Sequence, residues 1–180
     1  MGWKNSVLVG LRSGAKVRRM RSIRGILGAL KGGPLELGSR LPAVSQVDQD
    51  GERRDLAETG GEGFLLVYFY PKAGTPNCTK QACGLRDAFE ELSGRGVTVL
   101  GVSSDGPLVQ KAFREKFRLP FTLLADEDGT VRKAFGVPRL LGITMRQSFL
   151  FKGGLLVWRD LSTAAERQAA DVLRAIDKAS

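Results

Sequence analysis

The 180-residue sequence predicts one α/β domain in which helices flank a mixed central sheet. Apolar runs of strand length alternate with amphipathic helical segments, and a turn signal near the C-terminus separates two further strands. No internal repeat divides the chain. One full core suits this length, whereas two domains would each be unusually small. We therefore assign residues 34–180 to the domain and residues 1–33 to a basic N-terminal extension.

Three apolar runs are typical of buried strands. They are FLLVYFY (64–70), VTVLGVSS (97–104) and FTLLAD (121–126). Each run is short and rich in β-branched or aromatic residues, which favours strand over helix. Because helical segments lie between the runs, they predict a parallel core.

Three helices are predicted from apolar residues at helical spacing. Segment Cys78–Leu92 has a stripe formed by Ala82, Leu85, Phe89 and Leu92. Segment Leu108–Phe117 repeats the pattern with Leu108, Ala112, Phe113 and Phe117. A last helix is expected to start after Ser162 or Thr163 and to end near Lys178.

Two hairpins complete the predicted fold. QSFLF (147–151) and LLVWRD (155–160) flank the turn signal Lys152-Gly153-Gly154, which is typical of an antiparallel pair. The early segment PAVSQVDQDGERRDL holds a second hairpin with Asp50-Gly51 at its tip. This hairpin is an N-terminal addition to the sheet.

The absence of histidine excludes several kinds of site. Without histidine, neither a Ser-His-Asp nor a Cys-His catalytic pair can form. Zinc sites of the usual mixed type are also excluded, and two thiolates alone make a poor tetrahedral set. We therefore expect no metal and no cofactor. The two cysteines are too few for a disulfide framework, and no apolar run approaches the ~18 residues of a membrane span.

Positive charge is concentrated in residues 1–31. This segment carries eight Lys and Arg residues and no acid, so it supplies +8 of the net charge of +9 and leaves +1 for the rest. A nucleic-acid groove in the domain is therefore not expected. The extension suits a solvated tail, a weak membrane-surface contact or an organelle-targeting segment. We expect a cytoplasmic protein, with membrane association or organelle targeting as alternatives.

Cys78 and Cys83 follow a loop of turn residues. Pro71, Gly74 and Pro76 disfavour helix there, so the helix is predicted to begin at Cys78. A thiol in the first helical turn lies among unpaired backbone N–H groups at the positive end of the dipole, which favours thiolate. The helix terminus supplies only part of that stabilisation. Because the chain has no histidine, the remaining cation should be an arginine.

The two cysteines lie on different faces of the predicted helix. Cys78 falls at the centre of the buried stripe, and Cys83 lies about 140° away on the polar side. Free cysteine usually behaves as a small buried hydrophobe, so packing explains Cys78 but not Cys83. Two incidental thiols on one helix are the alternative interpretation.

The segment FYPKAGTPNCTKQACGLRD resembles the active-site segment of the peroxiredoxins. The likeness is to the bacterioferritin-comigratory or PrxQ-type branch of the alkyl hydroperoxide reductase/thiol-specific antioxidant family. That branch has Pro-x-x-x-Thr-x-x-Cys followed by a second cysteine five residues on. Its positions are filled by Pro71, Thr75, Cys78 and Cys83.

The likeness extends over roughly residues 35–160. GVSSDGPLVQKAFREKFRLPFTLLADEDGTVRKAFGV is similar to the family's next segment, and Arg146 in MRQSFLF matches the arginine that begins the strand beside the active site. Asn77 stands where the family commonly has glycine, and residues 1–33 have no counterpart.

The resemblance implies a thioredoxin-like fold and two-electron reduction of hydrogen peroxide or an alkyl hydroperoxide. It implies that Cys78 attacks the peroxide and becomes a sulfenic acid. Thr75, the Cys78 N–H and Arg146 would supply donors, and Pro71 would shield the thiolate. Cys83 would then close an intramolecular disulfide, which thioredoxin or a similar dithiol reopens. A monomer is expected, with a dimer as the alternative.

Other functions stay open at this point. A noncatalytic redox sensor would use the same two thiols, and only turnover separates it from an enzyme. A thioredoxin-type thiol-disulfide oxidoreductase would need C-x-x-C, whereas four residues separate these cysteines. A nucleic-acid or membrane-binding module would rest on residues 1–33 alone.

Overall fold

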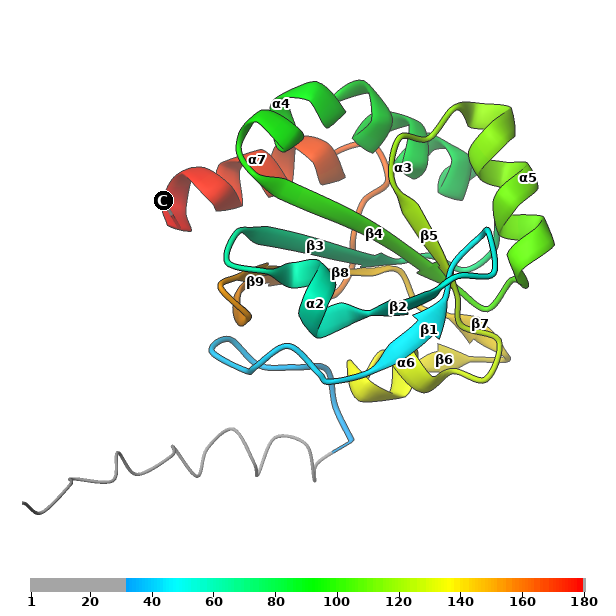
Figure 1. The fold of residues 1–180 in the computed structure, drawn as a ribbon, viewed down its shortest axis with the longest axis horizontal. Helices are drawn as coiled ribbons and strands as arrows, with labels where there is room; N and C mark the ends of the chain where they lie inside the picture. The colour runs from blue at the N-terminus through cyan, green and yellow to red at the C-terminus, as the bar shows by residue number, and fades with distance from the viewer. Residues whose placement is uncertain (1–31, 180) are drawn as a thin grey trace, which may run out of the picture.

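The computed structural model describes residues 32–179, which form a five-stranded mixed sheet between two layers (Figure 1). The strands, in spatial order, are β5 (Thr122–Ala125), β4 (Val97–Ser103), β3 (Phe64–Phe69), β8 (Gln147–Lys152) and β9 (Leu155–Asp160). The first three are parallel, and β8 is antiparallel to both β3 and β9. The predicted mixed sheet is confirmed, with strand ends within one residue of those expected.

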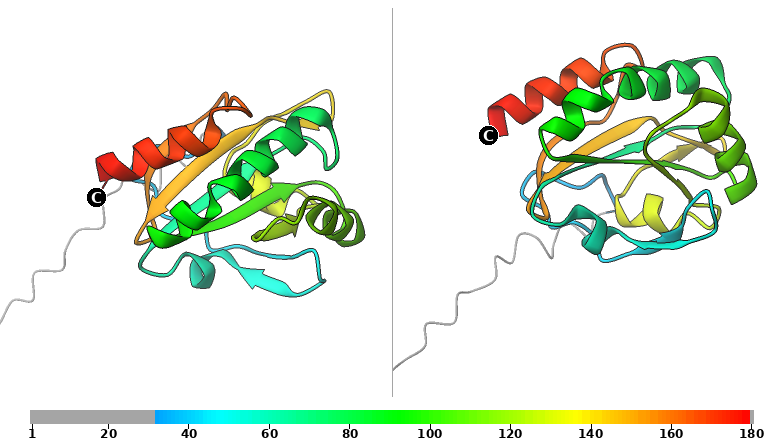
Figure 2. Two further views of the ribbon diagram at one scale, coloured as in Figure 1. Left: turned by 90° about the horizontal axis from the view of Figure 1, so that it is seen from above. Right: turned by 45° about the horizontal axis from the view of Figure 1, so that its top comes forward.

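Four helices cover one face of the sheet. They are α3 (Pro76–Asp87), α4 (Phe89–Gly94), α5 (Pro107–Phe117) and α7 (Gln168–Ala179). In Figure 1 α3, α4 and α7 lie above the sheet and α5 lies at its right-hand end, and Figure 2 shows α7 running beside α3 and α4. The other face carries α2 (Leu56–Gly60) and α6 (Thr130–Ala134).

The central strand β3 contributes side chains to a hydrophobic core on each face of the sheet. Phe64, Leu66 and Tyr68 pack in the cluster under α3, α4, α5 and α7. The intervening residues Leu65, Val67 and Phe69 pack in the cluster that includes α2 and α6. Because both faces of the sheet are covered, all six residues of β3 are buried, which explains the uninterrupted apolar run in the sequence.

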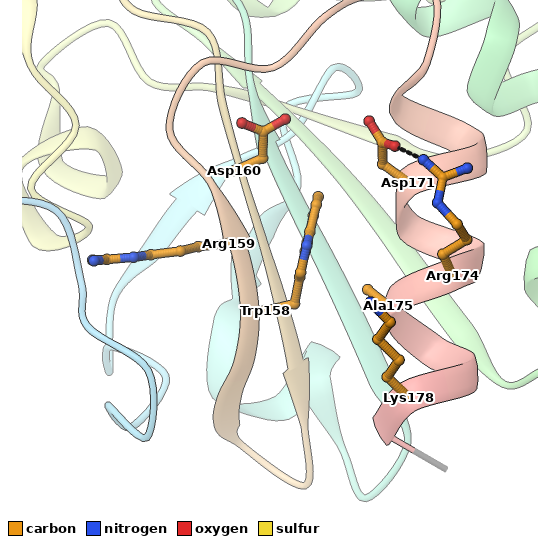
Figure 3. Close-up of a pocket in the computed structure, with 7 residues that line it drawn as sticks. All are labelled: Trp158, Arg159, Asp160, Asp171, Arg174, Ala175 and Lys178. Carbon is orange, nitrogen blue, oxygen red and sulfur yellow. Dashed lines mark hydrogen bonds and ion pairs between the residues drawn. The ribbon is translucent and has the colours of Figure 1, made fainter.

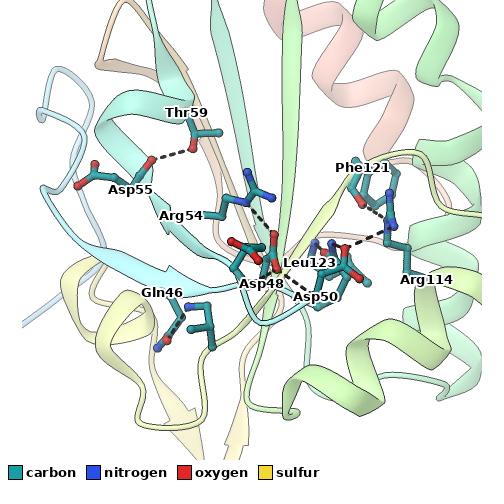
Figure 4. A network of polar contacts seen from close by, with 12 residues as sticks. Gln46, Asp48, Asp50, Arg54, Asp55, Thr59, Arg114, Phe121 and Leu123 are labelled. Carbon is teal, nitrogen blue, oxygen red and sulfur yellow. Dashed lines mark hydrogen bonds and ion pairs between the residues drawn. The ribbon is translucent and has the colours of Figure 1, made fainter.

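The predicted N-terminal hairpin consists of β1 (Ser45–Val47) and β2 (Arg53–Asp55). The buried carboxylate of Asp48 organises its turn by accepting bonds from the backbone of Asp50 and Glu52 and from Nε of Arg54 (Figure 4). A backbone bridge between Asp48 and Leu124 joins the hairpin to β5. The hairpin thereby covers part of the edge that β5 would otherwise expose.

The helix that carries both cysteines differs from the predicted segment at both ends. It begins at Pro76 rather than at Cys78, because proline suits the first helical position, where its missing N–H costs no bond. It ends at Asp87, and α4 follows after Ala88, whose ψ of 4° redirects the axis. No glycine or proline lies at this break, so no local signal in the sequence marks it. The predicted stripe still packs inward through Ala82, Leu85, Phe89 and Leu92.

The predicted inner face of α5 is partly wrong. The helix begins at Pro107, Leu108 is 83% exposed, and Ala112 is also exposed. Buried Gln110 takes the inward position instead, because its amide donates to the Ser103 hydroxyl and to a backbone carbonyl of β5. A buried amide can occupy an inward position when its hydrogen bonds are made. A prediction based on the spacing of apolar residues does not include such a residue.

The last helix begins at Gln168, later than predicted. Residues 164–167 form a turn in which the Arg167 N–H donates to the Ala164 carbonyl at 3.1 Å. Gln168 is then drawn inward by its hydrogen bond to the Ser148 hydroxyl. Tertiary bonding, rather than the Ser162 or Thr163 capping signal, sets this start.

A small hairpin and the two short helices α2 and α6 were not predicted from the sequence. The hairpin consists of β6 (Arg139–Leu140) and β7 (Ile143–Thr144) and comes just before β8. Within residues 32–179, no helix is long and apolar enough to cross a membrane. The basic extension was interpreted as a solvated tail, a membrane-surface contact or a targeting segment. These interpretations rest on residues 1–31, which lie outside the described residues.

Candidate active site

Cys78 is the third residue of α3 and is only 1% exposed. The first backbone bond of the helix runs from the Thr79 N–H to the Thr75 carbonyl at 2.8 Å. The N–H of Cys78 therefore has no acceptor within the helix. The sulfur and this N–H both lie at the positive end of the α3 dipole, where negative charge is stabilised.

Arg146 brings a cation to Cys78. It lies immediately before β8, whose first residue Gln147 pairs with Phe69 at the end of β3. That register returns Arg146 to the end of the sheet from which α3 starts. Its Nη2 lies 3.4 Å from Sγ of Cys78. The two residues are thus brought together by the sheet, whereas their chemical roles remain a prediction.

Gln81 is a site residue that the sequence reasoning missed. Its side chain is buried, and its Oε1 accepts a hydrogen bond from Nη1 of Arg146. Its Nε2 has no hydrogen-bond partner among the described residues. A polar residue beside Ala82 in the buried stripe is the signal that marks it. Gln81 holds the guanidinium of Arg146 against Cys78.

The loop that precedes α3 is anchored by Asp105. Its carboxylate accepts bonds from the Ala73 N–H and from the Ser103 hydroxyl, both at 2.7 Å. Ser103 in turn accepts from the amide of Gln110, and Gln110 accepts from the Tyr70 hydroxyl. Burial raises the pKa of Tyr70 well above its usual range, so the phenol stays a donor. This chain of bonds ties the loop to β4 and α5.

Pro71 and Thr75 both lie half-buried on this loop. The Thr75 hydroxyl donates to the Lys72 carbonyl at 3.1 Å and makes no capping bond to α3. The hydroxyl therefore braces the loop in this state. The roles of Thr75 as a donor to peroxide and of Pro71 as a shield remain predictions.

Cys83 lies further along α3, and both thiols are free. Its side chain is half-buried, whereas that of Cys78 is buried. In an intact helix, Cα atoms five residues apart are about 8 to 9 Å apart. A disulfide tolerates no more than ~7 Å. Cys78 and Cys83 therefore cannot bond until part of α3 unwinds.

We expect oxidation to unwind residues near 76–85 while β3 and β4 stay protected. The unwinding breaks the ion pair between Lys80 and Glu166 and the bond between Gln81 and Arg146. Gly84 eases it, since glycine weakens a helix by up to ~1 kcal/mol. Hydrogen exchange measured on the reduced and disulfide forms tests this expectation. Full amide protection over residues 79–85 in the disulfide form would contradict it.

A surface cavity of about 280 Å³ lies between β9 and α7 (Figure 3). Its lining residues are Trp158, Arg159, Asp160, Asp171, Arg174, Ala175 and Lys178. None of the predicted site residues is among them. Within residues 32–179, no group of three or more His, Cys, Asp or Glu side chains is arranged to hold a metal ion.

Comparison with known proteins shows the family to which the chain belongs. The sequence matches the AhpC/TSA family over residues 37–158, more than half of the chain. The chain belongs to the AhpC/TSA family. The peroxiredoxin Bcp of Escherichia coli K12 is 54% identical over 104 residues, which are 58% of this chain and 66% of that protein. The chloroplastic peroxiredoxin Q of Populus jackii is 45% identical over 115 residues, 63% of this chain and 54% of that protein.

Solved structures similar to this AhpC/TSA chain include members of the Bcp and PrxQ branch. The peroxidoxin BcpB of Mycobacterium tuberculosis superposes with a TM-score of 0.76 at 30% identity, covering 81% of this chain and 99% of that one. The bacterioferritin comigratory protein of Xanthomonas campestris gives 0.73 at 26% identity, covering 80% and 99%. The resemblance seen in the sequence and its thioredoxin-like fold are both confirmed.

Proposed function

We propose that this protein is a thiol peroxidase that reduces hydrogen peroxide or an alkyl hydroperoxide and is recycled by thioredoxin or a similar dithiol. The observation that carries the proposal is a buried thiol at a helix N-terminus with a guanidinium nitrogen 3.4 Å from its sulfur. The peroxiredoxin names of the relatives support the reaction class. The Xanthomonas structure, described for alkyl peroxide reduction, supports including organic hydroperoxides.

In the first step, the Cys78 thiolate attacks the distal oxygen of the hydroperoxide. An S–O bond forms and the O–O bond breaks, so the sulfur is oxidised to a sulfenic acid and the peroxide is reduced. The departing oxygen leaves as alkoxide or hydroxide and takes up a proton to give the alcohol or water. Negative charge thus moves from the sulfur to the departing oxygen.

Donors that face this moving charge lower the barrier. We assign Arg146 as one of these donors, because its Nη2 lies 3.4 Å from the sulfur and Gln81 holds its guanidinium. The free N–H of Cys78 adds a second donor at the same position. We assign Thr75 as a further donor once its bond to the loop is exchanged for one to peroxide, and Pro71 as the shield.

In the second step, Cys83 attacks the Cys78 sulfenic acid and closes a disulfide. Both thiols belong to the same α3, so the cycle needs no second subunit. A monomer is therefore expected to be competent. An external dithiol then reopens the disulfide by thiol–disulfide exchange.

Hydroperoxide consumption coupled to thioredoxin and its reductase tests this function. Sustained turnover of hydrogen peroxide or an alkyl hydroperoxide by the reduced protein is expected. A protein that oxidises once and is not recycled by any dithiol would be a sensor rather than an enzyme. That outcome would overturn the proposal.

A further inference from the structure

The loop at residues 71–75 leaves the sheet just before Cys78. The parallel ladder of β3 and β4 ends at Phe69 and Val102, and the backbone N–H of the next residue donates to the Val102 carbonyl at 3.1 Å. Beyond that bond the chain turns at Gly74, whose φ of 78° is a left-handed conformation that glycine adopts freely. The sheet therefore does not fix the position of residues 71–75, and another contact has to do so.

Asp105 supplies that contact from the connection between β4 and α5. Its Oδ2 accepts a hydrogen bond from the Ala73 N–H at 2.7 Å. Ala73 lies directly before the turn at Gly74 and two residues before Thr75. The Thr75 hydroxyl donates within the loop, and its carbonyl accepts from α3. The bond to Asp105 thus joins the loop to the body of the domain.

The carboxylate of Asp105 is itself held in place. The same Oδ2 accepts from the Ser103 hydroxyl at 2.7 Å, and the Asp105 N–H donates to that hydroxyl at 3.2 Å. Ser103 is buried and also accepts from the amide of Gln110, which in turn donates to the Leu124 carbonyl of β5. Because two strands and a helix support this network, the acceptor for Ala73 has a defined position.

We propose that Asp105 is a positioning residue for the oxidation of Cys78. It holds residues 71–75 closed over the thiol and thereby places Pro71 and Thr75 for the reaction. This role rests on the proposed peroxidase function and adds a residue to its first step, in which the S–O bond forms and the O–O bond breaks. Asp105 acts on that step through the backbone of the loop.

The burial of Cys78 makes the position of this loop important. The side chain of Cys78 is 1% exposed, and Ala73 packs against the core cluster that contains it. A loop that moves away opens a path to the sulfur and also displaces the hydroxyl of Thr75. A reagent that needs only access to the thiolate gains from this opening. A hydroperoxide, which needs donors placed at its oxygens, loses from it.

The cation beside Cys78 is held by other elements. Nη2 of Arg146 lies 3.4 Å from the sulfur, and its Nη1 donates to Gln81 of α3. Loss of the bond between Asp105 and the loop leaves these contacts in place. We therefore expect the thiolate fraction of Cys78, measured by its absorbance, not to fall in an Asp105 variant. A slower reaction with peroxide then reports misplaced groups in the loop.

Two substitutions separate the hydrogen bond of Asp105 from its charge. Asp105→Ala removes both. Asp105→Asn removes the charge but keeps an oxygen acceptor. Because the bonds from Ala73 and Ser103 both end on Oδ2, one amide oxygen at that position can accept both of them. Asp105→Asn should therefore behave like the parent if the hydrogen bond is what matters.

The experiment compares two reactions of Cys78 in the Cys83→Ser background, where it is the only thiol. Asp105→Ala should slow the first oxidation by hydrogen peroxide about tenfold, within the ~10² that a 1 Å misplacement costs. The same variant should be alkylated by iodoacetamide up to about tenfold faster, because losing a hydrogen bond to a charged acceptor shifts the loop toward an open state. Asp105→Asn should stay within about threefold of the parent in both reactions.

Asp128→Ala is the matched control and should keep both parental rates. The carboxylate of Asp128 also accepts from one backbone N–H and one hydroxyl, both of Thr130, but it belongs to the connection between β5 and α6. A partly unfolded protein or a smaller thiolate fraction would change the two reactions of Asp105→Ala without opposing signs. The inference stands only if its oxidation slows while its alkylation speeds up, and any other pair of rates would overturn it.

Hydrogen exchange gives a second readout that needs neither reaction. The Ala73 amide should exchange about tenfold faster in Asp105→Ala than in the parent or in Asp105→Asn, while β3 and β4 keep their protection. Equal exchange at Ala73 in the parent and in Asp105→Ala would contradict this inference alone. Failure of the proposed function would instead appear in the parent, as an absence of peroxide consumption.

Discussion

Cys78→Ser is expected to abolish hydroperoxide reduction, whereas Cys83→Ser should consume about one equivalent of peroxide and then stop. The difference follows from the position of each thiol on α3. Cys78 lies at the helix N-terminus, and Nη2 of Arg146 lies 3.4 Å from its sulfur, so we assign the attack on peroxide to this thiol. Cys83 lies five residues further along α3, and we assign it the attack on the sulfenic acid after part of α3 unwinds.

The two variants should therefore leave different products. In Cys83→Ser, the Cys78 sulfenic acid has no partner in the chain, so excess peroxide converts it to sulfinic acid. Mass spectrometry after one and after ten equivalents of peroxide measures this directly. Cys78→Ser should keep an unmodified Cys83 under the same treatment. Equal residual turnover in the two variants would contradict the roles assigned to Cys78 and Cys83.

Arg146→Ala is expected to slow peroxide reduction by ~10² or more, which is typical when a preorganised donor is removed from a reaction that develops charge. The variant loses a donor to the sulfur and also leaves Oε1 of buried Gln81 without its partner. A loss of ~10² corresponds to ~2.7 kcal/mol of transition-state stabilisation. Stopped-flow measurement of the first oxidation step isolates this effect from recycling.

Three further variants define the role of Arg146. Arg146→Lys keeps the charge but cannot contact Cys78 and Gln81 at once through a planar fork, so it should recover only part of the rate. Gln81→Leu should slow the step less than Arg146→Ala, because it removes only the residue that holds the guanidinium. Arg174→Ala, which breaks an exposed ion pair on α7, is the matched control and should keep the parental rate. An Arg146→Ala rate within threefold of the parent would exclude Arg146 from the mechanism.

Much of the fold follows from local patterns in the sequence. The buried run of β3 is uninterrupted, and that of β4 is broken only at Thr98, because both faces of the sheet are covered. An apolar run of this kind can be recognised from the sequence alone. The Lys152-Gly153-Gly154 turn likewise predicts the hairpin of β8 and β9, the two strands that it joins. Hydrophobic burial and turn geometry are properties of short segments, so a sequence displays them directly.

Only part of the candidate site could be predicted from such local patterns. The proline and glycine residues before Cys78 predict a thiol near a helix start, and the missing histidines direct attention to arginine. The family resemblance then selects Arg146. The sequence by itself thus predicted a thiol near a helix start, a second thiol on the same helix and the kind of cation, because those follow from residue type and spacing, whereas the catalytic roles came from the resemblance.

Tertiary structure decided which polar side chains are buried and what they bind. Gln81 and Gln110 interrupt apolar stripes, and their inward positions make sense only once Arg146 and Ser103 are seen opposite them. Asp105 binds the N–H of Ala73 because the parallel pairing of β3 and β4 brings the segments that follow them together. Hydrogen bonds between residues far apart in the chain leave no periodic trace. Their partners are set by how the elements pack, and only the folded structure reveals them.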